Sequence, residues 1–293
     1  MLKMTTRSIT YRSILGFRKY PVKTLVNVFI VYASIWTILE PLLGIVPLAQ
    51  NYFSGELKFF TLVFISILIG LYRSALPEEI EIKYGNSTIK VIYGDLFSFD
   101  GYKAIPISRY LFETQVVATS LQNKIIQMFV KSEEGTKGFD RYKQSLCTAV
   151  RGEKFQEVYR DATQQQEKYY PLGTTAFIDL AGKDYVLFSL TETELKGYIT
   201  NDNCNVSKMW IALEIFWNQV RIHARGNSIN IPLIGSGVTG IRLAPTQVLE
   251  INLLAIANAI EEKGKITTEE IRIILHPKYL EDINLTDLRK IWG

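Results

Sequence analysis

The chain has 293 residues, of which 47% are hydrophobic and 21% charged, so it can bury a sizeable core and is not a disordered protein. Its net charge of +4 is small for this length and gives no case for nucleic acid as a partner. The cysteines, Cys147 and Cys204, lie far apart in sequence, which argues against a disulfide scaffold and fits a reducing compartment. With only two histidines and no metal-ligand spacing, we expect no metal site.

Two apolar stretches precede residue 77. Residues 24–39 and 59–72 carry no charge, and each is shorter than the roughly 20 residues that cross a bilayer core. Their flanks lengthen them, because residues 41–55 are also uncharged and long basic side chains can reach the interface at Lys58 and Arg73. We therefore predict transmembrane helices at about 22–44 and 56–76, forming a hairpin over residues 22–76.

Basic residues set the predicted orientation of this hairpin. Residues 1–21 form a basic segment without acidic residues, and the positive-inside rule places it in the cytoplasm. Two spans return the chain to the same side, so both termini are expected to be cytoplasmic in a multi-pass membrane protein. A cleavable signal peptide and a buried hairpin of a soluble domain stay open as alternatives. Glu40 beside Pro41 is unusual within a span; we interpret it as a helix end at the interface, with a pore carboxylate as the alternative.

The remainder of the chain has the pattern of a cytosolic α/β domain. Periodicity and turn signals predict, in order, strand 87–93, strand 103–107, helix 120–131 capped by Ser120, a polar helical region 138–169, strands 174–180 and 185–190 around a turn, helix 206–224, strand 228–234, helix 244–262, strand 270–275 and a last helix in 277–292. Alternation of strands and helices favours a largely parallel or mixed sheet.

A glycine-rich loop follows the strand at 228–234. Its sequence is Gly235-Ser236-Gly237-Val238-Thr239-Gly240, and such loops bind phosphate because glycines let backbone N–H groups approach the anion. The string also matches G-x-G-x-x-G, which leaves a dinucleotide-dependent oxidoreductase open. Against that alternative, the loop opens the penultimate helix, and Leu275 and His276, not an acidic residue, end the next strand.

Two motifs in this order resemble macro domains. Val91–Leu96 resembles the Gly-Asp-Ile motif that ends an early macro-domain strand, Ala104–Ile107 stands where the second core strand lies, and Gly235–Gly240 resembles the phosphate loop. The resemblance covers about residues 80–293 and implies a macro-domain-like mixed sheet flanked by helices, which binds an ADP-ribose derivative.

The resemblance also implies the role of each site residue. Asp95 would accept a hydrogen bond from the adenine amino group, and Leu96 would offer its backbone N–H nearby. The ligand diphosphate would lie on Gly235, Ser236, Gly237, Val238, Thr239 and Gly240, with hydroxyl donors from Ser236 and Thr239. For Asp95, a turn stabilised by its own side chain is the alternative.

The segment after residue 107 departs from hydrolytic macro domains. Residues 108–115 contain no asparagine and no glycine run, so no catalytic residue is carried over. Glu113, Thr114 and Gln115 are assigned to the distal end of the ligand. The alternative function is a membrane-anchored ADP-ribosyl hydrolase, for which Glu113, Glu192 or Asp202 are the conceivable bases.

Two membrane helices before a divergent macro domain resemble the ThsA-like effectors of Thoeris anti-phage defence. The resemblance implies that a TIR-domain partner makes an ADP-ribose derivative from NAD, and that the effector binds this nucleotide second messenger. The effector is then expected to form homo-oligomers and disrupt the bacterial inner membrane, ending in abortive infection. The lipid bilayer is thus a further partner, and no cofactor is implied.

Overall fold

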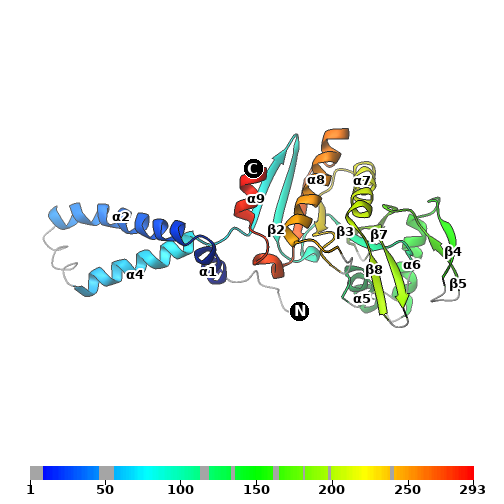
Figure 1. Ribbon diagram of the computed structural model, residues 1–293, viewed down its shortest axis with the longest axis horizontal. Helices are drawn as coiled ribbons and strands as arrows, with labels where there is room; N and C mark the ends of the chain where they lie inside the picture. Colours follow the sequence, from blue (N-terminus) through cyan, green and yellow to red (C-terminus); the bar gives the residue numbers. More distant parts are fainter. Residues whose placement is uncertain are drawn as a thin grey trace. The chain divides into compact units, whose positions relative to one another are not determined.

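The computed structural model describes residues 9–45, 56–112, 119–132, 136–160, 165–180, 182–196, 199–237 and 241–293. It divides into two compact units (Figure 1). One contains the N-terminal helices up to Glu78 together with Asn284–Asp287, and the other contains Glu79–Ile283 and Leu288–Gly293. Each unit is described separately below.

The N-terminal unit is helical. It contains α1 (Ile9–Lys19), α2 (Pro21–Ile45) and α4 (Glu56–Arg73), and α2 packs along α4. The two helices approach closely at Gly70, where an added Cβ would lie 2.4 Å from Val28 Cγ2 and 2.7 Å from Val28 Cα. Ser74 lies one turn further along and accepts a 3.0 Å hydrogen bond from Asn27 Nδ2. Small residues on α4 therefore permit the close backbone packing that is common between membrane helices.

Within the described ranges, α2 is the one helix that is long and apolar enough to cross a membrane, and 6% of its most apolar stretch is buried. Length and composition alone support this statement, and signal sequences share both properties. The 18-residue α4 includes Glu56, Lys58 and Arg73, so the predicted second span is not confirmed. The predicted helix end at Glu40 is wrong, because α2 continues through Pro41 to Ile45. A proline inside a helix removes one backbone hydrogen bond and crowds the carbonyl four residues earlier, but α2 does not end there.

The second unit is built on an eight-stranded mixed sheet, and the predicted mixed sheet flanked by helices is confirmed. Its main path runs β1 (Glu79–Tyr84), β2 (Ser87–Tyr93), β10 (Glu270–Leu275), β9 (Ile229–Pro232), β3 (Tyr102–Ser108), β7 (Asp184–Lys196) and β6 (Thr175–Asp179), while β8 (Ile199–Asn203) pairs with β7. The five strands from β2 to β7 are parallel, and β1 and β6 flank them antiparallel.

Helices cover both faces of this sheet (Figure 1). On one face, α5 (Leu121–Ser132) and α6 (Thr136–Ala149) pack on a core that includes Leu187. On the other face lie α7 (Val206–His223) and α8 (Pro245–Lys263), and the ring of Phe188 lies 4.7 Å from that of Phe216. Because side chains alternate along a strand, neighbouring residues of β7 enter opposite cores.

Two predicted elements differ from the structure. Helix α6 ends at Ala149, and the rest of the predicted helical region forms an antiparallel pair, β4 (Gln156–Arg160) and β5 (Gln165–Tyr169). Gly152, with φ +94°, adopts a conformation that breaks the helix, and the polar sequence hides the strand period. The predicted last helix is divided into a 3-10 turn, η2 (Pro277–Leu280), and α9 (Leu285–Trp292), since the Asn284 side chain accepts from Thr286 N and starts a new helix. The sequence analysis also missed α1, β1 and β8.

Candidate ligand-binding site

The carboxyl ends of β2, β10 and β9 meet at one edge of the sheet. Tyr93 pairs with Leu275, and Ile274 pairs with Pro232, so residues far apart in sequence follow neighbouring strand ends. Strand β3 pairs with β9 only at Tyr102 and Lys103, which lie near its start. Closer to the carboxyl ends of β3 and β9, no hydrogen bonds join these two strands within the described residues. In parallel α/β sheets, such edges are where ligands bind.

Asp95 follows β2 and begins a 3-10 turn, η1 (Leu96–Ser98). Its Oδ1 accepts a 3.3 Å hydrogen bond from Phe97 N and lies 3.5 Å from Lys124 Nζ. No residue that the structure describes contacts its Oδ2 through a hydrogen bond or ion pair. The alternative of a turn stabilised by Asp95 therefore holds for one oxygen, while the other is free to accept from a ligand.

Leu96 is a buried residue whose side chain points into the core. The side chain belongs to the cluster between the sheet and helices α5 and α6. Its N–H makes no hydrogen bond within the described residues. A contribution of Leu96 to ligand binding is thus limited to the main chain, beside the free oxygen of Asp95.

His276 ends β10 next to Asp95 and was not among the predicted site residues. Its Nδ1 accepts a 3.2 Å hydrogen bond from Lys278 N. Burial lowers the pKa of His276, and Lys278 and Lys124 lower it further against the opposing effect of Asp95. The imidazole is therefore neutral at physiological pH. The sequence could have indicated His276 as a site residue, because it directly follows β10, the strand that pairs with β2.

Gly235 makes the turn after β9. Its φ is +99°, and an added Cβ would lie 2.7 Å from Met209 Sδ and 3.2 Å from Ile241 Cδ1. Only glycine fits this conformation and this space. At Gly237, by contrast, an added Cβ would meet no atom within 4 Å, so this part of the loop is open to an approaching ligand.

Ser236 is held by the protein itself. Its N–H and its Oγ donate to Leu233 O at 3.3 and 2.7 Å, and Tyr279 Oη donates to Ser236 Oγ at 2.9 Å. Since a serine hydroxyl has one hydrogen, the geometry makes Ser236 a positioning residue for the loop. Its predicted donation to a ligand stays a prediction. Val238, Thr239, Gly240, Glu113, Thr114 and Gln115 lie outside the described residues.

Two partners of the loop were missed by the sequence analysis. Tyr279 of η2 fixes Ser236, as described above. The buried Asn252 of α8 donates from Nδ2 to Ile234 O at 2.9 Å and to Val248 O at 2.7 Å. An asparagine within the apolar face of a helix is the signal that could have indicated this support.

A charged cluster lies at the end of β3, where the resemblance places a catalytic loop. Glu192 Oε1 accepts from Arg109 Nη1 at 2.9 Å, from Lys208 Nζ at 3.1 Å and from Tyr169 Oη at 2.7 Å. The Arg109 guanidinium also lies 3.9 Å from the centre of the Tyr169 ring. Burial raises the pKa of Glu192, but the hydrogen bonds from Tyr169, Lys208 and Arg109 outweigh burial and lower the pKa overall. A carboxylate held in this way is a poor general base.

The sheet order, the helices on both faces and the glycine loop at the carboxyl edge define a macro-domain-like α/β protein. A family model described as "Thoeris protein ThsA, Macro domain" matches residues 89–276, about two thirds of the chain. The chain therefore belongs to the ThsA macro-domain family, and the predicted resemblance is confirmed at this level. No curated protein matches the chain.

Solved macrodomain structures are among those to which this chain is similar. A macrodomain from Oceanobacillus iheyensis with MES bound is 12% identical, with a TM-score of 0.47 over 73% of this chain and 98% of that chain. A Trypanosoma brucei macrodomain in complex with ADP-ribose is 11% identical, with a TM-score of 0.40 over 66% of this chain and 67% of that chain. At these values the likeness carries no weight in the proposals below.

Proposed function

We propose that this protein is a membrane effector of anti-phage defence whose macro domain binds an ADP-ribose derivative as an activating signal. The single observation that carries the proposal is the pairing of two sites at one sheet edge. The free Asp95 oxygen follows β2, and the open Gly235–Gly237 turn follows β9, in a chain of the ThsA macro-domain family. TIR-domain proteins that cleave NAD would supply the signal.

The chemistry of this edge supports a purine nucleotide diphosphate. The Asp95 oxygen and the Leu96 N–H offer an acceptor and a donor side by side, which complements the amino group and a ring nitrogen of adenine. The glycine turn follows β9, the second strand from β2 in the sheet, and offers backbone to phosphate at Gly237 without a side chain in the way. One ligand with an adenine at one end and phosphate groups in the middle would use both.

We propose binding without turnover. The Glu192 carboxylate is occupied by Arg109, Lys208 and Tyr169, and its lowered pKa disfavours a role as a base. The alternative, an ADP-ribosyl hydrolase, would depend on Glu113 or Asp202, whose side chains lie outside the described part of the chain. Release of ADP-ribose from a modified protein, lost on Glu113→Gln, would favour that alternative.

We further propose that α4 spans the membrane with α2, with both termini in the cytoplasm. Its Phe60 and Phe64 are 65% and 60% exposed, as expected of a lipid-facing surface. Lys58 and Arg73 stand at its ends, where long basic side chains can reach the headgroups. Signal binding would then favour a homo-oligomer that disrupts the bilayer, provided that the oligomer binds the nucleotide more tightly than the monomer does.

Liposome leakage tests this proposal. Full-length protein in dye-loaded liposomes is exposed to ADP-ribose, to NAD, or to the products of NAD cleavage by a TIR-domain protein. We expect leakage with at least one ADP-ribose derivative and none without ligand. Equal leakage with and without all three additions would contradict gating. Calorimetry on the same preparation reports binding separately, so that a failure of binding is distinguished from a failure of the membrane step.

A further inference from the structure

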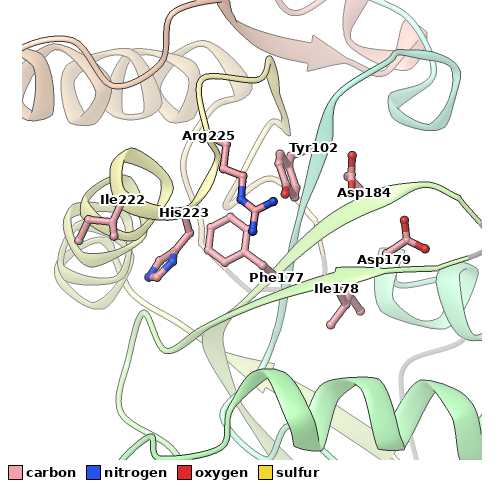
Figure 2. Close-up of a pocket in the computed structure, with 8 residues that line it drawn as sticks. All are labelled: Tyr102, Phe177, Ile178, Asp179, Asp184, Ile222, His223 and Arg225. Carbon is pink, nitrogen blue, oxygen red and sulfur yellow. The ribbon is translucent and has the colours of Figure 1, made fainter.

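A cavity lies at the opposite, amino-terminal edge of the parallel strands (Figure 2). It encloses about 320 Å³, at the lower end of ligand pockets. The start of β3, the β6–β7 hairpin and the end of α7 form it, through Tyr102, Phe177, Ile178, Asp179, Asp184, Ile222, His223 and Arg225. Because Tyr102 begins β3 and pairs with the first residue of β9, this cavity is separate from the loop that follows β9.

Arg225 enters this cavity at a cost to the fold. Its φ of +52° is the only positive φ of a non-glycine residue in the described ranges. The following glycine is fixed in place, because Thr268 Oγ1 and Glu269 N donate to Gly226 O at 2.8 and 3.2 Å. An arginine in left-handed backbone is strained, and such strain concentrates at functional sites. The guanidinium is directed towards Tyr102 and Phe177 (Figure 2).

Two carboxylates present a second unfavourable arrangement in the same cavity. Asp179 and Asp184 stand directly opposite each other in the antiparallel β6–β7 pair, where like charges destabilise a sheet. Asp179 Oδ1 accepts a 3.3 Å hydrogen bond from Gly182 N, which explains one aspartate by the turn. Asp184 makes no hydrogen bond or ion pair to a described side chain, and neither does Arg225. The turn therefore explains why Asp179 is present, but not why Asp184 is.

An aromatic wall lies between the two kinds of charge. The Tyr102 ring meets Phe177 edge-on at 5.5 Å, and Phe177 lies 5.4 Å from the His223 ring. Burial, followed by the charge of Asp184, raises the pKa of Tyr102, so its hydroxyl stays protonated beside the carboxylates. The cavity thus offers a cation, anions and a flat apolar surface within the span of one small molecule.

We propose that this cavity is a second ligand site, which takes a small zwitterion of amino-acid size. The carboxylate of the ligand pairs with Arg225, its ammonium group pairs with Asp184 and Asp179, and its apolar body packs on Tyr102 and Phe177. Such a ligand supplies direct ion-pair partners to Arg225 and Asp184, which make none with a described side chain. The site is independent of the nucleotide proposal, because it lies at the other edge of the sheet.

Matched small molecules test the site by calorimetry on the full-length protein in detergent. The probes are L-leucine and L-phenylalanine, their amides, which lack the carboxylate, and the corresponding deaminated acids, which lack the ammonium group. We expect at least one amino acid to bind, and each of its two analogues to bind at least tenfold more weakly. Absence of binding by both amino acids, or equal binding by an amino acid and its analogues, would overturn the proposal.

Two variants separate the site from the fold. Arg225→Asn removes the charge but keeps a residue that tolerates left-handed backbone, so we expect an unchanged or raised Tm and at least tenfold weaker binding. Asp184→Asn removes the opposed charges and should give the same pair of results. Retained binding in Arg225→Asn would overturn the proposal. Lost binding in both variants together with a lowered Tm would also overturn it, because the loss would then follow from damage to the fold. Gly237→Glu, at the other edge, is the control that should leave amino-acid binding unchanged.

Discussion

Replacement of Gly235 by alanine is the most direct test of the loop geometry. The new Cβ would lie 2.7 Å from Met209 Sδ, 3.2 Å from Ile241 Cδ1 and 3.3 Å from Val248 Cγ1, on backbone with φ +99°. Strained backbone of this kind costs about 1–3 kcal/mol. Overpacking adds about 1–3 kcal/mol, towards the low end because methionine adapts its shape. Loss of unfolded-state entropy returns about 0.4–1 kcal/mol. The net expectation is a destabilisation of about 2–4 kcal/mol.

Thermal melts of the full-length protein in detergent measure this effect. For a domain of this size, 1 kcal/mol changes Tm by about 2–4 °C, so we expect a decrease of about 5–15 °C. Gly237→Ala is the matched control, because its Cβ would meet no atom within 4 Å. We expect that control to change stability by less than about 0.5 kcal/mol. Equal effects of the two alanine substitutions would refute the strained, closely packed turn at Gly235.

Three further predictions concern the same edge of the sheet. Gly237→Glu places a carboxylate where the diphosphate would lie, and at about 4 Å the repulsion between the two is about 4 kcal/mol. Calorimetry should therefore show roughly 1000-fold weaker binding of the ADP-ribose derivative, at an unchanged Tm. Normal affinity would exclude Gly237 from the site. Tyr279→Phe removes the hydroxyl that donates to Ser236 and should lower the free energy of unfolding by about 1 kcal/mol in urea titrations. The effect should become smaller in a Ser236→Ala background, where only Ser236 O is left as an acceptor, and an equal effect in both backgrounds would contradict the bond to Ser236 Oγ. Glu192→Gln should flatten the acid limb of the stability curve. The folded-state pKa of Glu192 lies below the usual 4.5, so its contribution is present above that value and is lost as pH falls through the folded-state pKa; an identical acid limb in wild type and variant would contradict this assignment.

The two proposed sites lie at opposite edges of one sheet and offer different chemical groups to a ligand. The carboxyl edge combines backbone donors with a free carboxylate oxygen, which suits a nucleotide. The amino edge combines unpaired side-chain charges of both signs, which suits a small zwitterion. Titration of one ligand in the presence of the other would measure any coupling between them, because coupling free energies are reciprocal.

Local patterns in the sequence determined much of this protein. Strands 87–93 and 270–275 match the structure residue for residue, because both are short segments rich in apolar, β-branched residues. Helices α7 and α8 followed from apolar residues at helical spacing, and Ser120 caps α5 as predicted, accepting from Asn123 N at 3.0 Å. Turn chemistry and motif order then led to the macro-domain family. The polar hairpin β4–β5 could not be found in this way, because strands that bury little leave no periodic signal.

Only the tertiary structure decided how the side chains are used. The sequence predicted Ser236 as a donor to the ligand, but the fold places Leu233 O and Tyr279 within reach of its hydroxyl. Likewise, no spacing joins Arg109 to Glu192, or Arg225 to Asp184. Arg109 reaches Glu192 because parallel pairing of β3 with β7 aligns residues that lie far apart along the chain, and Arg225 and Asp184 line one cavity without a direct contact.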